Sequence, residues 1–190
     1  KGSAGGFTVL AEKTASQIEV HKQYGGVVPE IAGRKHAEKM LPVIQSVMKG
    51  YDKPDAIAVT AGPGLMTGLL VGTEAAKTLS YLWEVPLISV NHIEGHIYSV
   101  LLPDNQTTTQ SDNQIQFPAV CLIVSGGHTE FILMKDHGNY EKIGGTRDDA
   151  VGEAFDKVAK MLELEYPGGP KISKFAETGN TQAIPFPRPM

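Results

Sequence analysis

The sequence has 190 residues, the size of one ordinary domain or of one domain with the start of a second. Its 17 Lys and Arg against 21 Asp and Glu give a formal net charge of −4, which argues against a strongly basic nucleic-acid-binding arm. A hydrophobic share of 41% excludes an intrinsically disordered chain. No apolar run reaches the roughly 18 residues of a membrane helix. Cys121 is the single cysteine, so we expect a reduced, cytoplasmic protein.

The first part of the chain alternates helix and strand patterns. Residues 1–6 are linker-like or tag-like, and the apolar run at residues 7–10 predicts a short strand. Apolar spacing predicts a helix at residues 30–49, in which Pro42 starts a second helix or introduces a kink. Further patterns predict a buried strand at 55–60, a helix at 65–83, a strand at 86–90 and a helix at 92–102.

The second part begins after a polar segment. Residues 103–116 are rich in Thr, Gln and Asn, which predicts a surface loop between two lobes. Strands are predicted at 119–124, 130–134 and 140–143, and helices at 149–164 and 172–177. Such alternation favours an α/β protein. We expect a first lobe at residues 1–102 and the beginning of a second, incomplete lobe at 117–190.

Two histidines four residues apart form the first candidate site. His92 and His96 belong to the segment Asn-His-Ile-Glu-Gly-His, and on a helix such a pair leaves one face. Two imidazoles there could share a metal ion whose third ligand, most plausibly a carboxylate, comes from elsewhere. Zinc proteases place the acid directly after the first His, whereas Glu94 lies one position later, which weakens a protease interpretation. The alternative is a pair of surface or hydrogen-bonded histidines.

A glycine turn between two predicted strands is the second candidate site. It comprises Val124, Ser125, Gly126, Gly127 and His128. Glycines allow positive φ and close backbone approach, and free N–H groups in such a turn bind phosphate or carboxylate. An ordinary hairpin with Gly-Gly at its tip is equally compatible with the pattern.

An acidic helix at residues 149–164 is the third candidate site. Its predicted buried stripe consists of Val151, Phe155, Val158 and Leu162, and its opposite face of Asp149, Gly152, Glu153 and Asp156. A glycine costs a helix about 1 kcal/mol relative to alanine. Gly152 therefore indicates that another segment packs close to the backbone there. Asp156 could accept hydrogen bonds from ribose hydroxyls, and a solvated acidic face is the alternative.

Small residues recur every four positions in the helix predicted at residues 65–83. The stripe consists of Gly64, Gly68, Gly72 and Ala76. It predicts close helix packing, within the fold or against a partner subunit. Glycine before a helix is also a weak anion-site signal, because both the Walker lysine and the dinucleotide fingerprint are absent.

Seven segments in this order resemble one family, the bacterial tRNA threonylcarbamoyladenosine transferases, formerly described as glycoproteases. The segments are Gln-Tyr-Gly-Gly-Val-Val-Pro-Glu (23–30), Arg-Lys-His (34–36), Gly-Pro-Gly-Leu (62–65), Asn-His-Ile-Glu-Gly-His (91–96), Ser-Gly-Gly-His-Thr (125–129), Asp-Asp-Ala-Val-Gly-Glu-Ala-Phe-Asp-Lys (148–157) and Tyr-Pro-Gly-Gly-Pro (166–170). The resemblance covers residues 15–190. It implies a two-lobed, actin-like ATPase fold of the ribonuclease H-like type, with the second lobe incomplete.

The resemblance also implies an activity. The family transfers a threonylcarbamoyl group from threonylcarbamoyl-AMP to the N6 amine of the adenosine beside the anticodon, in tRNAs that read ANN codons. His92 and His96 would bind one divalent metal ion per subunit, iron first and zinc as the alternative. Residues 124–128 would hold the adenylate, and Asp156 and Gly169 its nucleoside part. Implied partners are tRNA, a paralogous actin-like subunit and a small ATPase, with no membrane.

Two departures from the family pattern lead us to expect an incomplete form. Residues 1–10 do not supply the first hydrophobic strand and its Asp/Glu-Thr-Ser turn. The family also continues beyond residue 190 with an aspartate as the third metal ligand and an asparagine that contacts the adenylate. A non-catalytic actin-like subunit, acting as an interaction module, is the second hypothesis. Such a module would not need His92, His96 and the glycine turn, so their presence favours the enzyme. A metalloprotease is the least favoured alternative.

Overall fold

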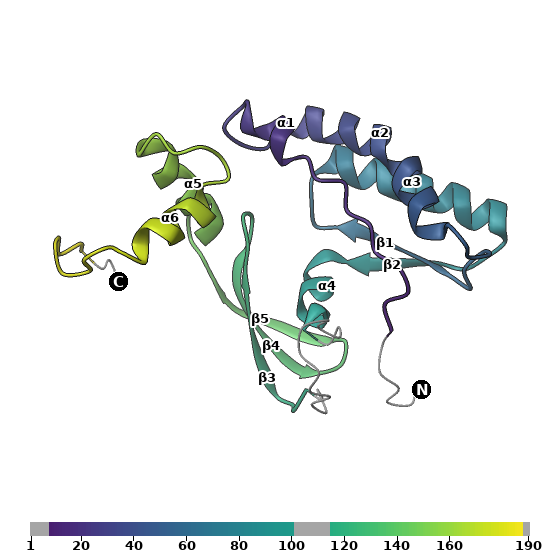
Figure 1. Cartoon of the computed structure of the whole chain (residues 1–190). Coiled ribbons are helices and arrows are strands. Elements are labelled where there is room, and N and C mark those ends of the chain that lie inside the picture. The colour runs from purple at the N-terminus through teal and green to yellow at the C-terminus, as the bar shows by residue number, and fades with distance from the viewer. Residues whose placement is uncertain (1–7, 101–114, 188–190) are drawn as a thin grey trace.

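The computed structural model describes residues 8–100 and 115–187 (Figure 1). It is a mixed α/β protein with two small sheets, in agreement with the predicted class. The elements in chain order are α1 (Ile18–Lys22), α2 (Pro29–Met48), β1 (Ile57–Gly62), α3 (Met66–Trp83), β2 (Leu87–Asn91), α4 (His92–Ser99), β3 (Ala119–Val124), β4 (Thr129–Asp136), β5 (Asn139–Gly145), α5 (Val151–Met161) and α6 (Gly168–Ala176). The predicted inter-lobe loop lies almost wholly outside the described residues.

The first sheet is a parallel pair of strands covered by two helices. β1 pairs with β2 from Ile57 opposite Leu87 to Thr60 opposite Val90. α3 packs on β1, and α2 packs on α3, so the two helices lie side by side in Figure 1. Gly33 allows this approach, because a Cβ there would lie 2.7 Å from Cβ of Thr67. Parallel strands need such a helical crossover between them.

The second sheet is antiparallel, in the order β3-β4-β5. β3 and β4 are joined through the predicted glycine turn, with Val124 opposite Thr129. One face of the sheet carries the main core of the described chain, in which Ile123, Ile132 and Met134 contact Ile97 of α4. Met134 is completely buried. Alternation along the strands places these side chains on the same face.

α4 joins the two sheets. It begins immediately after β2 and places Ile97, which is 5% exposed, against the second sheet. Asn91 caps the helix, because its Oδ1 accepts hydrogen bonds from the backbone N–H groups of Ile93 and Glu94. The predicted helix at residues 92–102 is therefore present and ends at Ser99, and residues 101–102 lie outside the described range.

Several predicted features differ in the structure. Residues 8–10 of the predicted first strand are irregular, and the short helix α1 was not predicted. Pro42 lies inside α2 and neither starts a new helix nor interrupts this one. In the small-residue stripe, Ala76 is buried and a Cβ on Gly72 would lie 3.7 Å from Val59, whereas a Cβ on Gly68 would meet nothing within 4 Å. No helix in the described part of the chain is long and apolar enough to cross a membrane.

The buried stripe predicted for α5 is wrong. Its four apolar side chains are 38–61% exposed, namely Val151, Phe155, Val158 and Leu162. The buried residue of α5 is Ala159, at 1%. α5 packs on α6 through small residues, since a Cβ on Gly168 would collide with Cβ of Ala159. Amphipathic spacing identifies the apolar face of a helix, but it does not say which element covers that face.

Candidate active site

The two predicted metal ligands lie on one face of α4. The Nε2 atoms of His92 and His96 are 3.2 Å apart, and the ring centroids are 4.4 Å apart. Without a metal, this separation allows one ring N–H to donate to the other ring nitrogen. His92 is half-buried, and His96 is exposed. The i,i+4 spacing and the Asn91 cap together set this geometry.

The environment of His92 favours a neutral imidazole. Burial lowers the pKa of His92 below its usual 6.5, and the nearby positive charges of His96 and His128 lower it further. Metals bind the neutral ring, so the lowered pKa favours a metal ligand at neutral pH.

The distance between the two histidines suits a shared metal ion. For metal–nitrogen bonds of 2.0–2.1 Å in a tetrahedral site, two nitrogens lie roughly 3.3 Å apart. The Nε2 atoms are already 3.2 Å apart, so one ion could bridge them with little movement. Within residues 8–100 and 115–187, no cluster of three or more His, Cys, Asp or Glu side chains could hold a metal. The described residues could therefore supply two ligands at this place, and metal binding itself stays a prediction.

The glycine turn lies next to the histidine pair. The ring of His128 is 6.1 Å from that of His92, centroid to centroid. The turn is closed by Ser125, whose Oγ accepts from the N–H groups of Gly127 at 3.3 Å and His128 at 3.0 Å. The Ser125 N–H also donates to the His128 carbonyl at 2.8 Å. Sequence reasoning predicted residues in both segments separately, and the fold brings them together.

The turn does not use the positive φ that its glycines allow. Neither Gly126 nor Gly127 is among the glycines with positive φ. The Ser125 hydroxyl shapes the turn by hydrogen bonding instead, as Ser commonly does in loops. A Cβ on either glycine would meet nothing within 4 Å, so this surface of the turn is open to a ligand.

α5 is anchored directly on the turn. The Gly152 N–H donates to the Ser125 carbonyl at 3.2 Å, and the Val151 N–H donates to Oγ1 of Thr129 at 2.9 Å. A Cβ on Gly152 would lie 2.8 Å from both Cα of Gly126 and the Ser125 oxygen. The prediction of a close backbone approach at Gly152 is confirmed, although the residue is in the first turn of the helix.

Asp156 lies one helical turn after Gly152 and connects α5 to α6. Its Oδ1 accepts from the backbone N–H of Gly168 at 2.8 Å, which places Gly169 in the adjacent first turn of α6. Asp156 is half-buried, and its other oxygen makes no hydrogen bond within the described residues. Two further acids pair with Lys157, as they would on a solvated face: Asp149, just before α5, at 2.6 Å and Glu153 of α5 at 3.0 Å.

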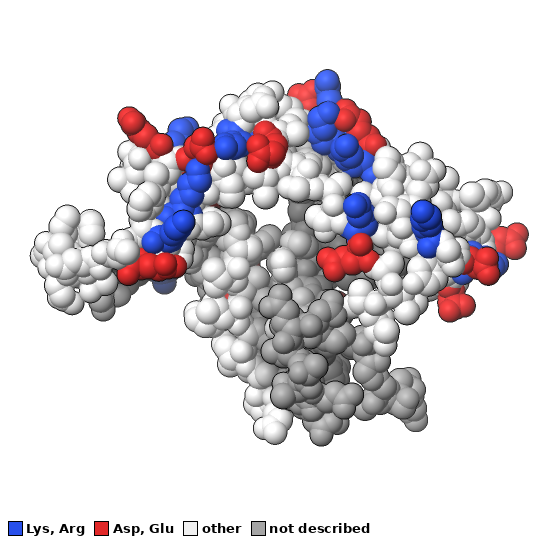
Figure 2. All heavy atoms as spheres, in the orientation of Figure 1, with Lys and Arg blue, Asp and Glu red and all other residues white. Residues whose placement is uncertain are grey.

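Charged side chains are mixed on the face drawn in Figure 2, where Lys and Arg lie beside Asp and Glu. Ion pairs of this kind include Arg34 with Glu30 and Lys35 with Glu38, both at 2.6 Å. On this face the positive charges are therefore balanced by neighbouring negative ones.

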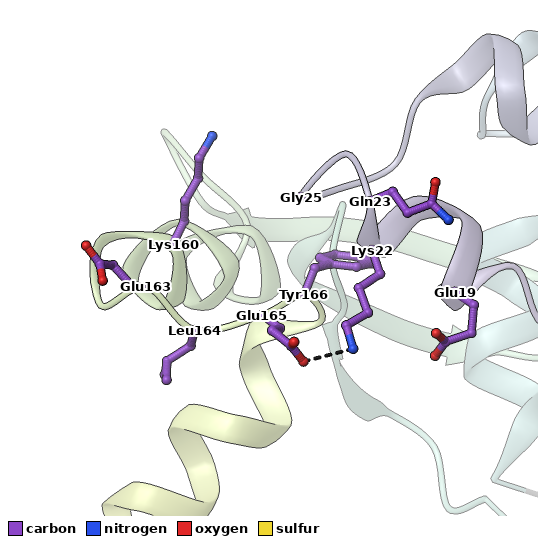
Figure 3. A pocket seen from close by; sticks show the side chains of 9 residues that line it. All are labelled: Glu19, Lys22, Gln23, Gly25, Lys160, Glu163, Leu164, Glu165 and Tyr166. Carbon is purple, nitrogen blue, oxygen red and sulfur yellow. Dashed lines mark ion pairs between the residues drawn. The ribbon is translucent and has the colours of Figure 1, made fainter.

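A cavity of about 550 Å³ lies away from the histidine pair, between α1 and the connection from α5 to α6. Figure 3 shows Lys22 reaching across it to Glu165. Their Nζ and Oε2 atoms are 2.8 Å apart, and Lys171 pairs with the same carboxylate at 2.9 Å. The cavity is wide open and two of its charged side chains neutralise each other, so it is a weaker ligand site than the turn.

The Lys22–Glu165 ion pair should make stability depend on pH and salt. Hydrogen bonds from Lys22 and then Lys171 lower the pKa of Glu165 from 4.5 to about 2. The stabilisation is present above pH 4.5 and is lost as the pH falls towards 2. We expect Glu165→Gln to lower Tm slightly at pH 7 in low salt, and the difference to shrink in 0.5 M NaCl, because exposed pairs are screened. Thermal unfolding tests this, with Glu163→Gln, which keeps both ion pairs, as the control. Equal Tm values for the two variants in low salt would contradict the prediction.

Two polar contacts of this region were not predicted. Tyr140 of β5 donates to Glu94 at 2.9 Å. His21, which is 4% exposed, hydrogen-bonds Gln17 and accepts from the Val28 N–H, and so fixes the loop between α1 and α2. The sequence carries no local pattern for either, because the first joins distant segments and the second depends on the conformation of a loop.

Comparison with known proteins decides the family. The sequence profile of tRNA N6-adenosine threonylcarbamoyltransferase matches residues 8–190. The chain belongs to this family. Proteins of that name from Symbiobacterium thermophilum, Bacillus subtilis and Thermomicrobium roseum are 50%, 51% and 50% identical to it, over 96–97% of this chain.

The chain spans about half the length of these curated relatives, between 51% and 53%. The histidine pair, the glycine turn and the α5–α6 junction all lie within the matched part. The resemblance inferred from seven motifs is thus confirmed for the family.

Proposed function

We propose that this chain provides part of the active site of a tRNA N6-adenosine threonylcarbamoyltransferase. The reaction moves the threonylcarbamoyl group of threonylcarbamoyl-AMP to the N6 amine of the adenosine beside the anticodon, in tRNAs reading ANN codons. The observation that carries the proposal is the approach of the His92–His96 pair to the Ser125–His128 turn, with ring centroids 6.1 Å apart. Membership of the family supports the same reaction.

The finer architecture belongs to this proposal. We assign an actin-like, ribonuclease H-like fold with a first lobe at residues 1–102, an inter-lobe loop at 103–116 and the beginning of a second lobe at 117–190. The parallel pair under α2 and α3, followed by the antiparallel sheet, supports this division.

Each part of the site has a role in the proposal. His92 and His96 hold one divalent metal ion, iron or zinc, through Nε2. When bound, such an ion supplies Lewis acidity to the carbamoyl carbonyl. Residues 124–128 contact the adenylate through the open side of the turn. Asp156 accepts hydrogen bonds from the ribose through its second carboxylate oxygen, while Oδ1, bonded to the Gly168 N–H, keeps Gly169 beside the nucleoside.

The proposed partners are tRNA, a paralogous actin-like subunit and a small ATPase. The mixed surface charges and the net charge of −4 favour an RNA-binding surface that several subunits share.

The direct test combines the protein, either metal ion, threonylcarbamoyl-AMP, an ANN-reading tRNA and the two partner proteins. Digestion to nucleosides and mass spectrometry measure modified adenosine, and calorimetry measures adenylate binding. Metal-dependent modification is expected. Absence of both modification and adenylate binding would contradict the proposal.

The second candidate, an interaction module, is supported by the exposed apolar stripe of α5. It predicts association with a partner subunit without adenylate or metal binding.

A further inference from the structure

Glu94 lies midway between the two predicted metal ligands in sequence but takes no part in their face of the helix. Each residue of an α-helix turns the chain by about 100°, so a residue two positions from both His92 and His96 points to the opposite side. There the Glu94 carboxylate is half-buried and accepts a hydrogen bond from the Tyr140 hydroxyl at 2.9 Å. The acid that looked misplaced for a protease therefore faces the second sheet.

The Tyr140 hydroxyl is well suited to donate this bond. Burial raises the pKa of Tyr140 above its usual value, and hydrogen bonds with Tyr98 and Glu94 raise it further. The hydroxyl therefore keeps its proton across the physiological range. A hydrogen bond to an ionised carboxylate is roughly twice as strong as a neutral one.

The same side of α4 also makes the apolar contacts with the second sheet. Ile97 lies in the buried cluster with Met134, and Ile93 packs against that cluster. At the other end of the helix, the Tyr98 hydroxyl and His137 Nδ1 are hydrogen-bonded at 2.9 Å. Apolar contacts tolerate small rotations of a helix about its axis, whereas a directional hydrogen bond in its first turn restricts them.

Rotation of α4 would change the site. His92 and His96 lie on the far side from Tyr140, and His92 lies 6.1 Å from the ring of His128. A turn of the helix of only a few degrees would move these rings relative to the Ser125–His128 turn. If its donor were lost, the partly buried Glu94 carboxylate would be more stable exposed to water, and this would favour rotation of the helix.

We propose that the Tyr140–Glu94 hydrogen bond fixes the rotation of α4, so that Tyr140 and Glu94 are positioning residues for the His92–His96 pair. Neither residue touches the adenylate or the metal. The metal readout of the proposal rests on the proposed function, but the placement of the helix does not.

The test compares four single variants and one double variant. Tyr140→Phe removes the donor, Glu94→Ala removes the acceptor, and Glu94→Gln keeps an acceptor oxygen while removing the charge. Tyr81→Phe is the matched control: it also removes a tyrosine hydroxyl, but from a side chain that is 88% exposed. Hydrogen exchange measured by mass spectrometry reports on the α4 amides, and titration with Co²⁺ or Zn²⁺ reports on the histidine pair.

Tyr140→Phe and Glu94→Ala are expected to speed exchange in α4 and to weaken metal binding by about tenfold or less, because neither residue hydrogen-bonds a ligand imidazole directly. Glu94→Gln should restore most of both, and Tyr81→Phe should change neither. Once Tyr140→Phe has removed the donor, truncating Glu94 should add little, so the double variant Glu94→Ala/Tyr140→Phe should behave like Tyr140→Phe alone. Urea unfolding on each protein separates these effects from global stability.

Unchanged exchange and metal affinity in Tyr140→Phe would overturn the proposal. So would a loss in Glu94→Gln without one in Tyr140→Phe, because the carboxylate charge and not the hydrogen bond would then matter. If the unsubstituted protein binds no metal, the metal part of the proposed function fails, and the exchange data alone decide the positioning role. If Tyr140→Phe does not fold, Glu94→Ala against Glu94→Gln makes the same comparison.

Discussion

Substituting Ala for His92 or His96 is expected to reduce metal content from about one ion per chain to a trace. Each substitution removes one of the two proposed ligand atoms, the Nε2 atoms that lie 3.2 Å apart. Loss of an outer partner alone costs 10- to 100-fold in affinity, so loss of a ligand should cost on the order of 100-fold or more. Metal analysis by mass spectrometry and titration with Co²⁺ or Zn²⁺ measure the effect.

The matched control is His36→Ala, which removes an exposed histidine from α2. It should bind metal like the unsubstituted protein. Equal metal content in all three variants would contradict the assignment of the pair, because the ion would then be bound elsewhere.

Metal affinity should also depend on pH, decreasing as the pH is lowered. Protonation of His92 competes with the metal, so affinity decreases as the pH falls through the pKa of this residue. Burial, and then the charges of His96 and His128, hold that pKa below 6.5. His92 therefore stays available to the metal at a lower pH than an ordinary histidine. Titrations between pH 5 and pH 8 test this, and an affinity independent of pH would contradict it.

The sequence predicts the local parts of this site because their signals are short-range. The i,i+4 spacing places His92 and His96 on one helix face, and an apolar strand on each side of Gly126 and Gly127 predicts the turn. Helix and strand positions in most of the chain follow from the same periodicities. These rules describe neighbours within about one turn of the backbone.

Tertiary contacts explain what the sequence could not predict. The exposed stripe of α5, with Phe155 40% exposed, depends on which element packs against the helix. The Tyr140–Glu94 bond joins residues 46 positions apart, and a single sequence carries no signal for such a pair. Gly152 is an intermediate case, because a glycine within a predicted helix indicates a close contact but does not identify the segment that makes it.

The segment that packs against Gly152 is the turn itself, which gives this residue a large expected effect on ligand binding. In Gly152→Ala, the new Cβ would lie 2.8 Å from Cα of Gly126 and from the Ser125 oxygen, and 2.9 Å from the Gly126 nitrogen. These atoms are backbone, so no side chain can move aside. The turn and α5 must separate, and the 3.2 Å hydrogen bond from Gly152 to Ser125 lengthens or breaks.

Two effects on stability oppose each other in this variant. Overpacking costs about 1–3 kcal/mol, whereas Ala improves helix propensity by about 1 kcal/mol relative to Gly. We therefore expect a net loss of about 0–2 kcal/mol in the free energy of unfolding. Adenylate affinity should fall more than tenfold, since the displaced turn carries the proposed contact surface. Gly68→Ala in α3 is the matched control: its Cβ meets nothing within 4 Å, it lies outside the turn, and it should retain adenylate affinity. Calorimetric binding of ATP or threonylcarbamoyl-AMP, with urea unfolding on each protein, tests the pair. Tight adenylate binding by a folded Gly152→Ala variant would show that the turn does not hold the nucleotide.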